Sequence, residues 1–259
     1  MPNTLQSEAK LLQINTTASW RARDDRRASA VWLGIFWLFT GLGFGFDLKN
    51  FAHESPPVPL VVNVHAIVAA VWLLLVTALV LLVEFNNVKL HRTLGWFAAG
   101  FAVLVAILAP WGQLSWQAVN LNTPGAFPPE FLSIAFSSII CFVILLPYGV
   151  LLRSNPGAHR RVMILSTIAM TDPGFSRLVG LFLPGQSTWI GQYLYFFGGN
   201  LLIMILMFVW DWRKKRLMKQ FLQGASLILV VDSTAVVLYF NAGWKSFARH
   251  WVESLARHL

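Results

Sequence analysis

The amino-acid sequence predicts an all-α integral membrane protein, a bundle of about seven transmembrane helices with a cytoplasmic N-terminus. Of its 259 residues, 56% are hydrophobic and only 12% are charged, and the mean hydropathy is +0.61. A water-soluble fold cannot bury that much apolar surface. The apolar residues also gather in runs of roughly 20, the length at which a helix crosses a hydrocarbon core about 30 Å thick.

Seven runs satisfy this condition in chain order: 30–47, 58–84, 91–112, 131–152, 160–183, 189–210 and 225–242. Together they predict a transmembrane domain over 30–242, preceded by a polar N-terminal tail, 1–29. The tail is too long and too mixed in charge for the front of a cleavable signal peptide, so we expect the first helix to be retained.

The C-terminal segment 243–259 has apolar and charged residues at helical spacing. Trp244 and Trp251 fall on one side of such a helix, opposite Arg249. This pattern predicts an amphipathic helix that lies on the membrane surface. The alternative is that the run 225–242 enters the membrane and returns without crossing it, which would place the basic C-terminal segment on the cytoplasmic side.

The basic residues favour one orientation in the membrane. Fifteen of the 20 lysines and arginines lie in the tail and in alternate loops: five in 1–29, then Lys89, Arg92, Arg153, Arg160, Arg161, Arg213, Lys214, Lys215, Arg216 and Lys219. Loops rich in such residues stay in the cytoplasm. We therefore expect a multi-pass protein of the bacterial inner (cytoplasmic) membrane. Its expected partners are the lipid bilayer and either further copies of the chain or a larger membrane complex, and not nucleic acid.

Four ionisable side chains fall inside the apolar runs: His65, Asp172, Arg177 and Asp232. Each costs about 2.5–3.5 kcal/mol to insert, so it calls for a functional explanation. Helical geometry places His65 and Arg177 at a common depth in the outer half, with Asp172 lower as the expected counter-ion of Arg177. We predict a ligand- or ion-binding site formed by His65, Asp172 and Arg177. The alternative is an ion pair that only fixes the shape of the fifth helix.

Pro173-Gly174 separates Asp172 from Arg177 in the middle of the fifth run. This is a turn sequence, and it predicts that the fifth helix is broken or kinked there. Irregular backbone at that depth is tolerated where it faces protein or a water-filled cavity, and in transporters such breaks line binding sites.

Two histidines begin the third and fifth runs at the same expected depth, and each is followed by an arginine. His91 and His159 could hold a shared metal ion or a haem as ligands from different helices. The alternative is that both are interfacial anchors. In that case Arg92, Arg160 and Arg161 would contact anionic lipid headgroups or a phosphate.

Three features together resemble a family of uncharacterised bacterial polytopic membrane proteins (a domain of unknown function): His65 in the second run, His91-Arg92-x-Leu94-Gly95 opening the third, and His159-Arg160-Arg161-x-Met163 opening the fifth ahead of Arg177. The resemblance covers roughly residues 60–180. It implies that the two His-Arg helix starts and the later arginine belong to one site. The family has a glutamine-type residue at the end of the second helix, where this chain has Glu84.

Three functions remain open on these residues. The first is small-molecule, ion or proton-coupled binding or transport at the intramembrane polar cluster. The second is a membrane redox protein that binds haem or a metal through His91 and His159, and the third is a non-catalytic accessory subunit of a larger membrane complex. The sequence assigns no catalytic residue. With Cys141 as its single cysteine, the chain cannot ligate an iron–sulfur cluster by its own thiolates.

Overall fold

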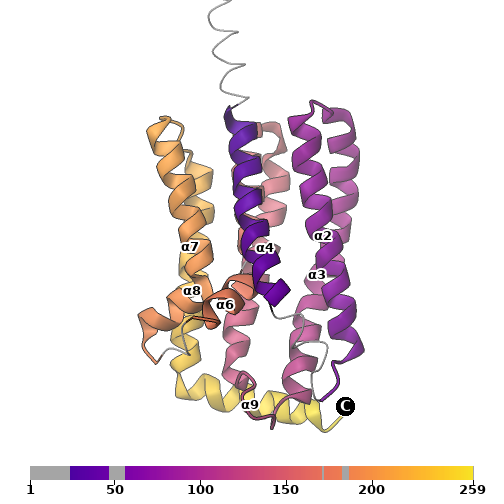
Figure 1. The fold of residues 1–259 in the computed structure, drawn as a ribbon, viewed down its shortest axis with the longest axis vertical. Helices are drawn as coiled ribbons and strands as arrows, with labels where there is room; N and C mark the ends of the chain where they lie inside the picture. The colour runs from indigo at the N-terminus through magenta and orange to yellow at the C-terminus, as the bar shows by residue number, and fades with distance from the viewer. Residues whose placement is uncertain (1–23, 47–55, 171, 183–186, 259) are drawn as a thin grey trace, which may run out of the picture.

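A computed structural model describes residues 24–46, 56–170, 172–182 and 187–258 of the chain. Every regular element in this part is a helix, which confirms the predicted all-α fold (Figure 1). The helices are an N-terminal helix Asp24–Phe46, α2 Leu60–Glu84, α3 Val88–Val119, α4 Leu132–Leu151, α5 Pro156–Ile168, α6 Asp172–Gly180, α7 Trp189–Arg213, α8 Lys219–Phe240 and α9 Ala242–Ala256.

Six of these helices are long and apolar enough to cross a membrane: the N-terminal helix, α2, α3, α4 with the short 3₁₀ turns at its ends, α7 and α8. Their apolar surface faces outward as well as inward. On α2, Leu60 and Leu74 are largely exposed while Trp72 is buried. A helix with apolar residues on all sides is suited to contact lipid on one side and protein on the other.

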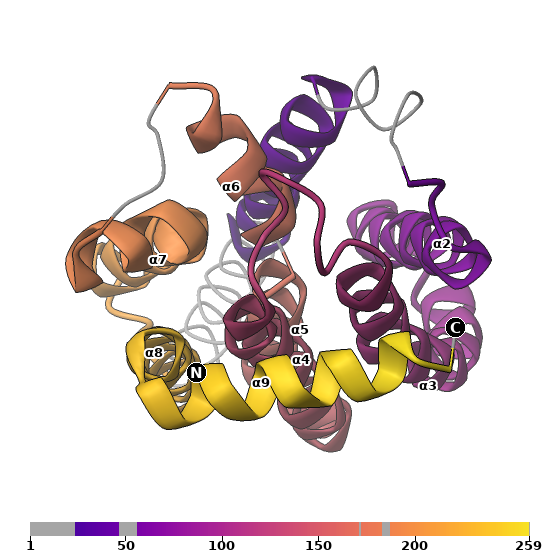
Figure 2. The same ribbon diagram turned by 90° about the horizontal axis from the view of Figure 1, so that it is seen from below.

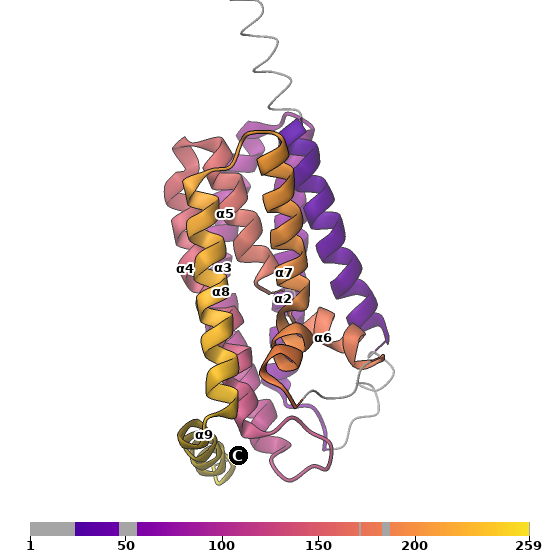
Figure 3. The same ribbon diagram turned by 90° about the vertical axis from the view of Figure 1, so that its left-hand side faces the viewer.

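The fifth predicted helix, 160–183, is two short helices in the structure. α5 ends at Ile168 and α6 begins at Asp172. Pro173 lies in the first turn of α6, a position that favours proline because its missing amide hydrogen is not needed there. The two separate helices confirm the predicted break. α6 lies crosswise to the long helices, between the N-terminal helix and α7 (Figure 3).

Two helical hairpins, α2–α3 and α4–α5, turn at the same end of the bundle as the α7–α8 connection (Figure 1). We call this the basic end, because Lys89, Arg153 and Lys214 lie on or beside these connections. The hairpins share a detail of sequence and geometry. Asn87 caps α3 by accepting a hydrogen bond from the Leu90 amide, and Asn155 caps α5 in the same way.

At the opposite end of the bundle, α9 runs across the ends of α8 and α3 (Figure 2). Ala248 and Val252 are fully buried there against Ala118 and Leu132. The indole nitrogen of Trp244 donates a hydrogen bond to the carbonyl oxygen of Glu130. The predicted C-terminal helix is therefore present, and part of its apolar side contacts the bundle itself.

Two predicted boundaries were wrong. The first helix begins at Asp24, inside the predicted polar tail 1–29, because its acidic first turn forms ion pairs with the basic end; residues 1–23 of that tail lie outside the described residues. α8 begins at Lys219, six residues earlier than expected, and continues without a break to Phe240. This length favours a helix that crosses the membrane over one that returns, and it moves Asp232 to the middle of the helix.

Candidate functional site

Two aspartates from different helices are buried in the interior of the bundle. Asp172 is in the first turn of α6 and is 4% exposed, and Asp232 is in the middle of α8 and is 1% exposed. Their carboxyl groups are close enough to interact electrostatically. The break between α5 and α6 allows this interaction, because it ends one helix in the interior and begins the next with a carboxylate.

The hydrogen bonds of the two carboxyl groups are incomplete. Ser138 on α4 donates to Oδ2 of Asp172 at 2.6 Å. Oδ1 of Asp172 and Oδ2 of Asp232 are both buried and have no hydrogen-bond partner among the described residues. A buried carboxylate oxygen without a donor is costly, so these atoms mark where a proton or another positive group would bind.

Neutral polar side chains complete the site. Asn200 on α7 and Ser137 on α4 lie beside the Asp232 carboxyl. Asn200 is 1% exposed, and neither its amide nitrogen nor its amide oxygen forms a hydrogen bond of good geometry within the described part of the chain. The buried hydroxyl of Tyr193, which lies within electrostatic reach of both carboxyls, also lacks a partner there. We call the following residues the carboxyl cluster: Ser137, Ser138, Asp172, Tyr193, Asn200 and Asp232.

Close backbone contacts hold α6 and therefore Asp172 in place. A Cβ atom at Gly43 of the N-terminal helix would overlap the carbonyl oxygen of Gly174, and one at Gly174 would lie 2.8 Å from Cα of Thr40. On the other side of α6, the Phe175 ring lies against α7 at Gly198 and Gly199, where a Cβ atom would meet it within 3 Å. Small residues let helix backbones approach closely in membrane bundles.

The site expected from the sequence is only partly assembled. Asp172 belongs to the carboxyl cluster, but Arg177 is exposed, donates to the carbonyl oxygen of Pro173 at 2.8 Å and lies over the Phe44 ring. Asp172 and Arg177 form no ion pair with each other, although both are described. His65 is on α2, against Gly112 of α3, whereas the cluster lies between α4, α6, α7 and α8.

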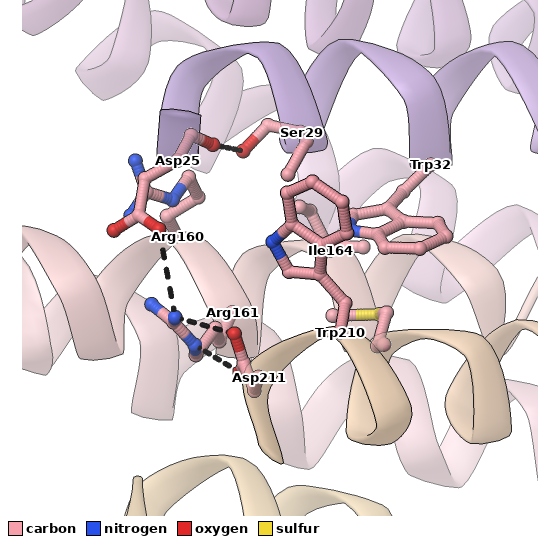
Figure 4. A pocket seen from close by; sticks show the side chains of 10 residues that line it. Asp25, Ser29, Trp32, Arg160, Arg161, Ile164, Trp210 and Asp211 are labelled. Carbon is pink, nitrogen blue, oxygen red and sulfur yellow. Dashed lines mark hydrogen bonds and ion pairs between the residues drawn. The ribbon is translucent and has the colours of Figure 1, made fainter. Parts of the chain in front are cut away.

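A second group of charges, at the basic end, is fully paired (Figure 4). Arg161 is buried and binds Asp211 through two nitrogens, at 2.5 and 2.7 Å. Asp25 accepts from Arg160 at 2.5 Å and from Arg216 at 2.8 Å, and lies 3.8 Å from Arg161. We call these five residues the basic-end network. Such bidentate, charge-assisted bonds are the strongest hydrogen bonds in proteins.

This network changes the interpretation of the arginines that follow the two histidines. The sequence suggested lipid or phosphate contacts for Arg92, Arg160 and Arg161. Arg160 and Arg161 instead bind carboxylates of the protein, whereas Arg92 is exposed. The structure does bring His91 and His159 together, with ring centres 6.4 Å apart.

Sequence analysis missed the contribution of α7 and α8 to the site. Asp232 was recognised as an ionisable side chain within an apolar run but was not placed in the predicted site, and Asn200 was not included in it either. The available signal was Asn200 itself, since an amide in the middle of an apolar run must find a partner in the interior.

Comparison of the chain with protein-family models, with curated proteins and with solved structures finds no match.

Proposed function

We propose that this chain is a multi-pass membrane protein that binds a proton at the carboxyl cluster and couples it to the transport of an ion or small molecule. The observation that supports this most directly is the pair of buried carboxyl groups, Asp172 and Asp232, with unpartnered oxygens. Intramembrane carboxylates that face the interior of a bundle are characteristic of proton relays and ion pathways.

The electrostatics favour a proton. Burial away from water disfavours the charged form of each carboxyl, and two carboxylates within electrostatic range also repel each other, so protonation of one of them relieves both effects. At 4% and 1% exposure, Asp172 and Asp232 are out of reach of a bulky ligand in this conformation. No three histidine, cysteine or acidic side chains group as metal ligands in the described residues.

The broken helix supplies a route for coupling. α5 and α6 together replace one long helix, and α6 presents Asp172 at its N-terminus, where the helix dipole favours a negative charge. Transporters use such interrupted helices to form ion sites near the middle of the membrane. Protonation of Asp172 removes this attraction and the repulsion from Asp232, so it changes the forces that position α6.

We further propose that the basic end lies in the cytoplasm, in the inner membrane of a bacterium, and that α5 with α6 completes a seventh, interrupted crossing. The distribution of lysine and arginine supports this orientation. Fusion of a reporter active only in the cytoplasm to residue 217 and to the C-terminus tests it. Activity at residue 217 and none at the C-terminus is expected, and the reverse would contradict the orientation.

The proton site is tested by infrared difference spectroscopy on the purified full-length protein as the pH is raised from 5 to 9. In the wild type we expect a buried protonated carboxyl, which gives a carbonyl band that disappears as the pH is raised. Asp172→Asn and Asp232→Asn should each alter that transition, because each removes one of the two buried carboxyls. A spectrum unchanged by both variants would contradict the proposal.

Transport is tested separately in proteoliposomes that contain a pH-sensitive dye. An imposed membrane potential should drive proton entry with the wild-type protein, and both asparagine variants should lose it. Asp24→Asn is the matched control, because Asp24 is an acidic residue of the basic end that faces Lys214 and Arg216. A carboxyl band without proton flux would retain the proton site and exclude proton movement in the absence of a co-transported solute.

A further inference from the structure

The imidazole rings of His91 and His159 lie close together where α3 and α5 begin. Their centres are 6.4 Å apart and the ring planes are nearly perpendicular, at 85°. Neither residue belongs to the carboxyl cluster, and both are half-buried. The proton-binding function proposed above gives this pair no role.

Both rings are held by the same kind of hydrogen bond. Nδ1 of His91 is 3.0 Å from the carbonyl oxygen of Leu79, and Nδ1 of His159 is 2.7 Å from that of Gly149. A carbonyl oxygen only accepts, so each Nδ1 carries the proton, and in the neutral ring Nε2 keeps its lone pair. This arrangement, with Nδ1–H on a backbone carbonyl and Nε2 unprotonated, is the one that orients histidines for metal binding.

The two histidines also occupy equivalent positions. Each is four residues after an asparagine that caps its helix, Asn87 in one hairpin and Asn155 in the other. Each ring reaches back to the first helix of its own hairpin for its carbonyl partner. Two identical ligands are thus presented from two similar hairpins at one depth, as an ion between them would require.

We propose that His91 and His159 bind one transition-metal ion between them, as ligands on opposite sides of the ion. Two metal–nitrogen bonds of about 2 Å in line would put the ring centres about 6 Å apart, close to the observed 6.4 Å. A tetrahedral angle at the ion would bring the rings nearer to each other. The chemistry is a bis-imidazole centre, in which the ion is either a haem iron or copper(I).

The surroundings of the pair narrow the choice of metal. A structural zinc site needs four protein ligands and a catalytic one needs three, but the described residues contain no group of three His, Cys, Asp or Glu side chains that could hold an ion. Calcium and magnesium require oxygen ligands. A haem iron brings four ligands of its own and lacks only the axial pair, while copper(I) is satisfied by few ligands.

The test uses the purified full-length protein from cells supplied with a haem precursor. Absorption spectra of the oxidised and dithionite-reduced protein measure haem, and titration with copper(I) against a coloured chelator measures ion binding. The variants are His91→Ala and His159→Ala. The matched control is His65→Ala, since His65 is a histidine of α2 that lies about 21 Å along the helix from Leu79.

One haem per chain, or one chelator-resistant copper(I) per chain, supports the proposal and shows which of the two the histidine pair binds. Either should fall by at least about tenfold in both alanine variants and stay unchanged in His65→Ala. His159→Met should keep the metal with an altered spectrum or affinity, because a thioether also ligates haem iron and copper(I). The proposal is overturned if the wild type binds neither, or if binding survives in both alanine variants.

Discussion

The basic-end network and the carboxyl cluster place buried acids in opposite situations. Asp25 and Asp211 each contact at least one guanidinium within 3 Å. Asp172 receives one hydrogen bond from a hydroxyl, and no described basic side chain forms an ion pair with it or with Asp232. The first arrangement fixes the charge of its acids, while the second leaves the charge free to change.

This difference indicates that the paired acids stabilise the fold, whereas the unpaired acids can change protonation state. A buried carboxylate with a bidentate arginine stays ionised and holds helices together. Two buried carboxylates within electrostatic range destabilise the fold unless a proton or cation joins them. Removal of a charged group should therefore have opposite effects on stability in the two regions.

The largest effect is expected from Arg161→Ala at the basic end. The change leaves the buried carboxylate of Asp211 without its partner and should destabilise the protein by about 3–5 kcal/mol. Thermal unfolding in detergent measures it. Arg249→Ala is the control, since Arg249 is 64% exposed in its pair with Glu253, and it should change stability by less than about 0.5 kcal/mol. Equal effects of the two variants would contradict the structural role of the network.

A smaller loss is expected from Gly43→Ala. The added methyl group overlaps the Gly174 carbonyl, so α6 must move and carry Asp172 with it, at a cost of about 1–3 kcal/mol. Gly41→Ala is a matched control on the same helix, because its Cβ would meet nothing within 4 Å. Proton flux should decrease only in the Gly43 variant. Similar proton flux in both variants would show that proton flux does not depend on the position of α6.

A gain in stability is expected from Asp232→Asn. The change removes one of two repelling charges while keeping the shape of the side chain, and we expect stabilisation of about 1 kcal/mol at pH 8, together with loss of proton flux. Unfolding and flux measured on one preparation check both parts. A destabilisation comparable to that of Arg161→Ala would show that the Asp232 carboxylate stabilises the fold, as the charges of the basic-end network do.

The smallest effect is expected from Ser138→Ala. It removes the hydroxyl that donates to Asp172 and should cost about 1 kcal/mol or less. The infrared transition of the carboxyl pair should move to higher pH, because the ionised form loses a donor. Ser166→Ala, which removes only a bond to the carbonyl of Met163, should leave the transition in place.

The sequence was sufficient for the parts of the fold that hydropathy controls. Apolar runs identified the six long helices, because the length and composition of a bilayer-crossing helix are tightly limited. Pro173-Gly174 located the break, since proline has no amide hydrogen to continue a helix. Helix starts were less certain. α8 begins with a polar turn, and the tertiary contacts that stabilise such a turn have no signature in a single sequence.

The candidate site was harder to predict, because charge pairing depends on distances between helices. Asp172 and Arg177 are five residues apart, which made them appear to be partners, yet in α6 they point to different surroundings. The true neighbour of Asp172 is sixty residues away on another helix. The same limit applies to Arg161, whose partner Asp211 is on α7.

The contact between Gly43 and Gly174 has a mechanical consequence. The helix that carries Gly43 also carries Asp25, 18 residues earlier. One continuous helix of about 27 Å therefore connects the basic-end network with the start of α6. At Gly43 and Gly174 the two backbones are in direct contact, so no side chain between them can change conformation when one helix moves. A rotation or shift of the N-terminal helix should therefore move α6, and with it Asp172 inside the bundle, without involving a loop.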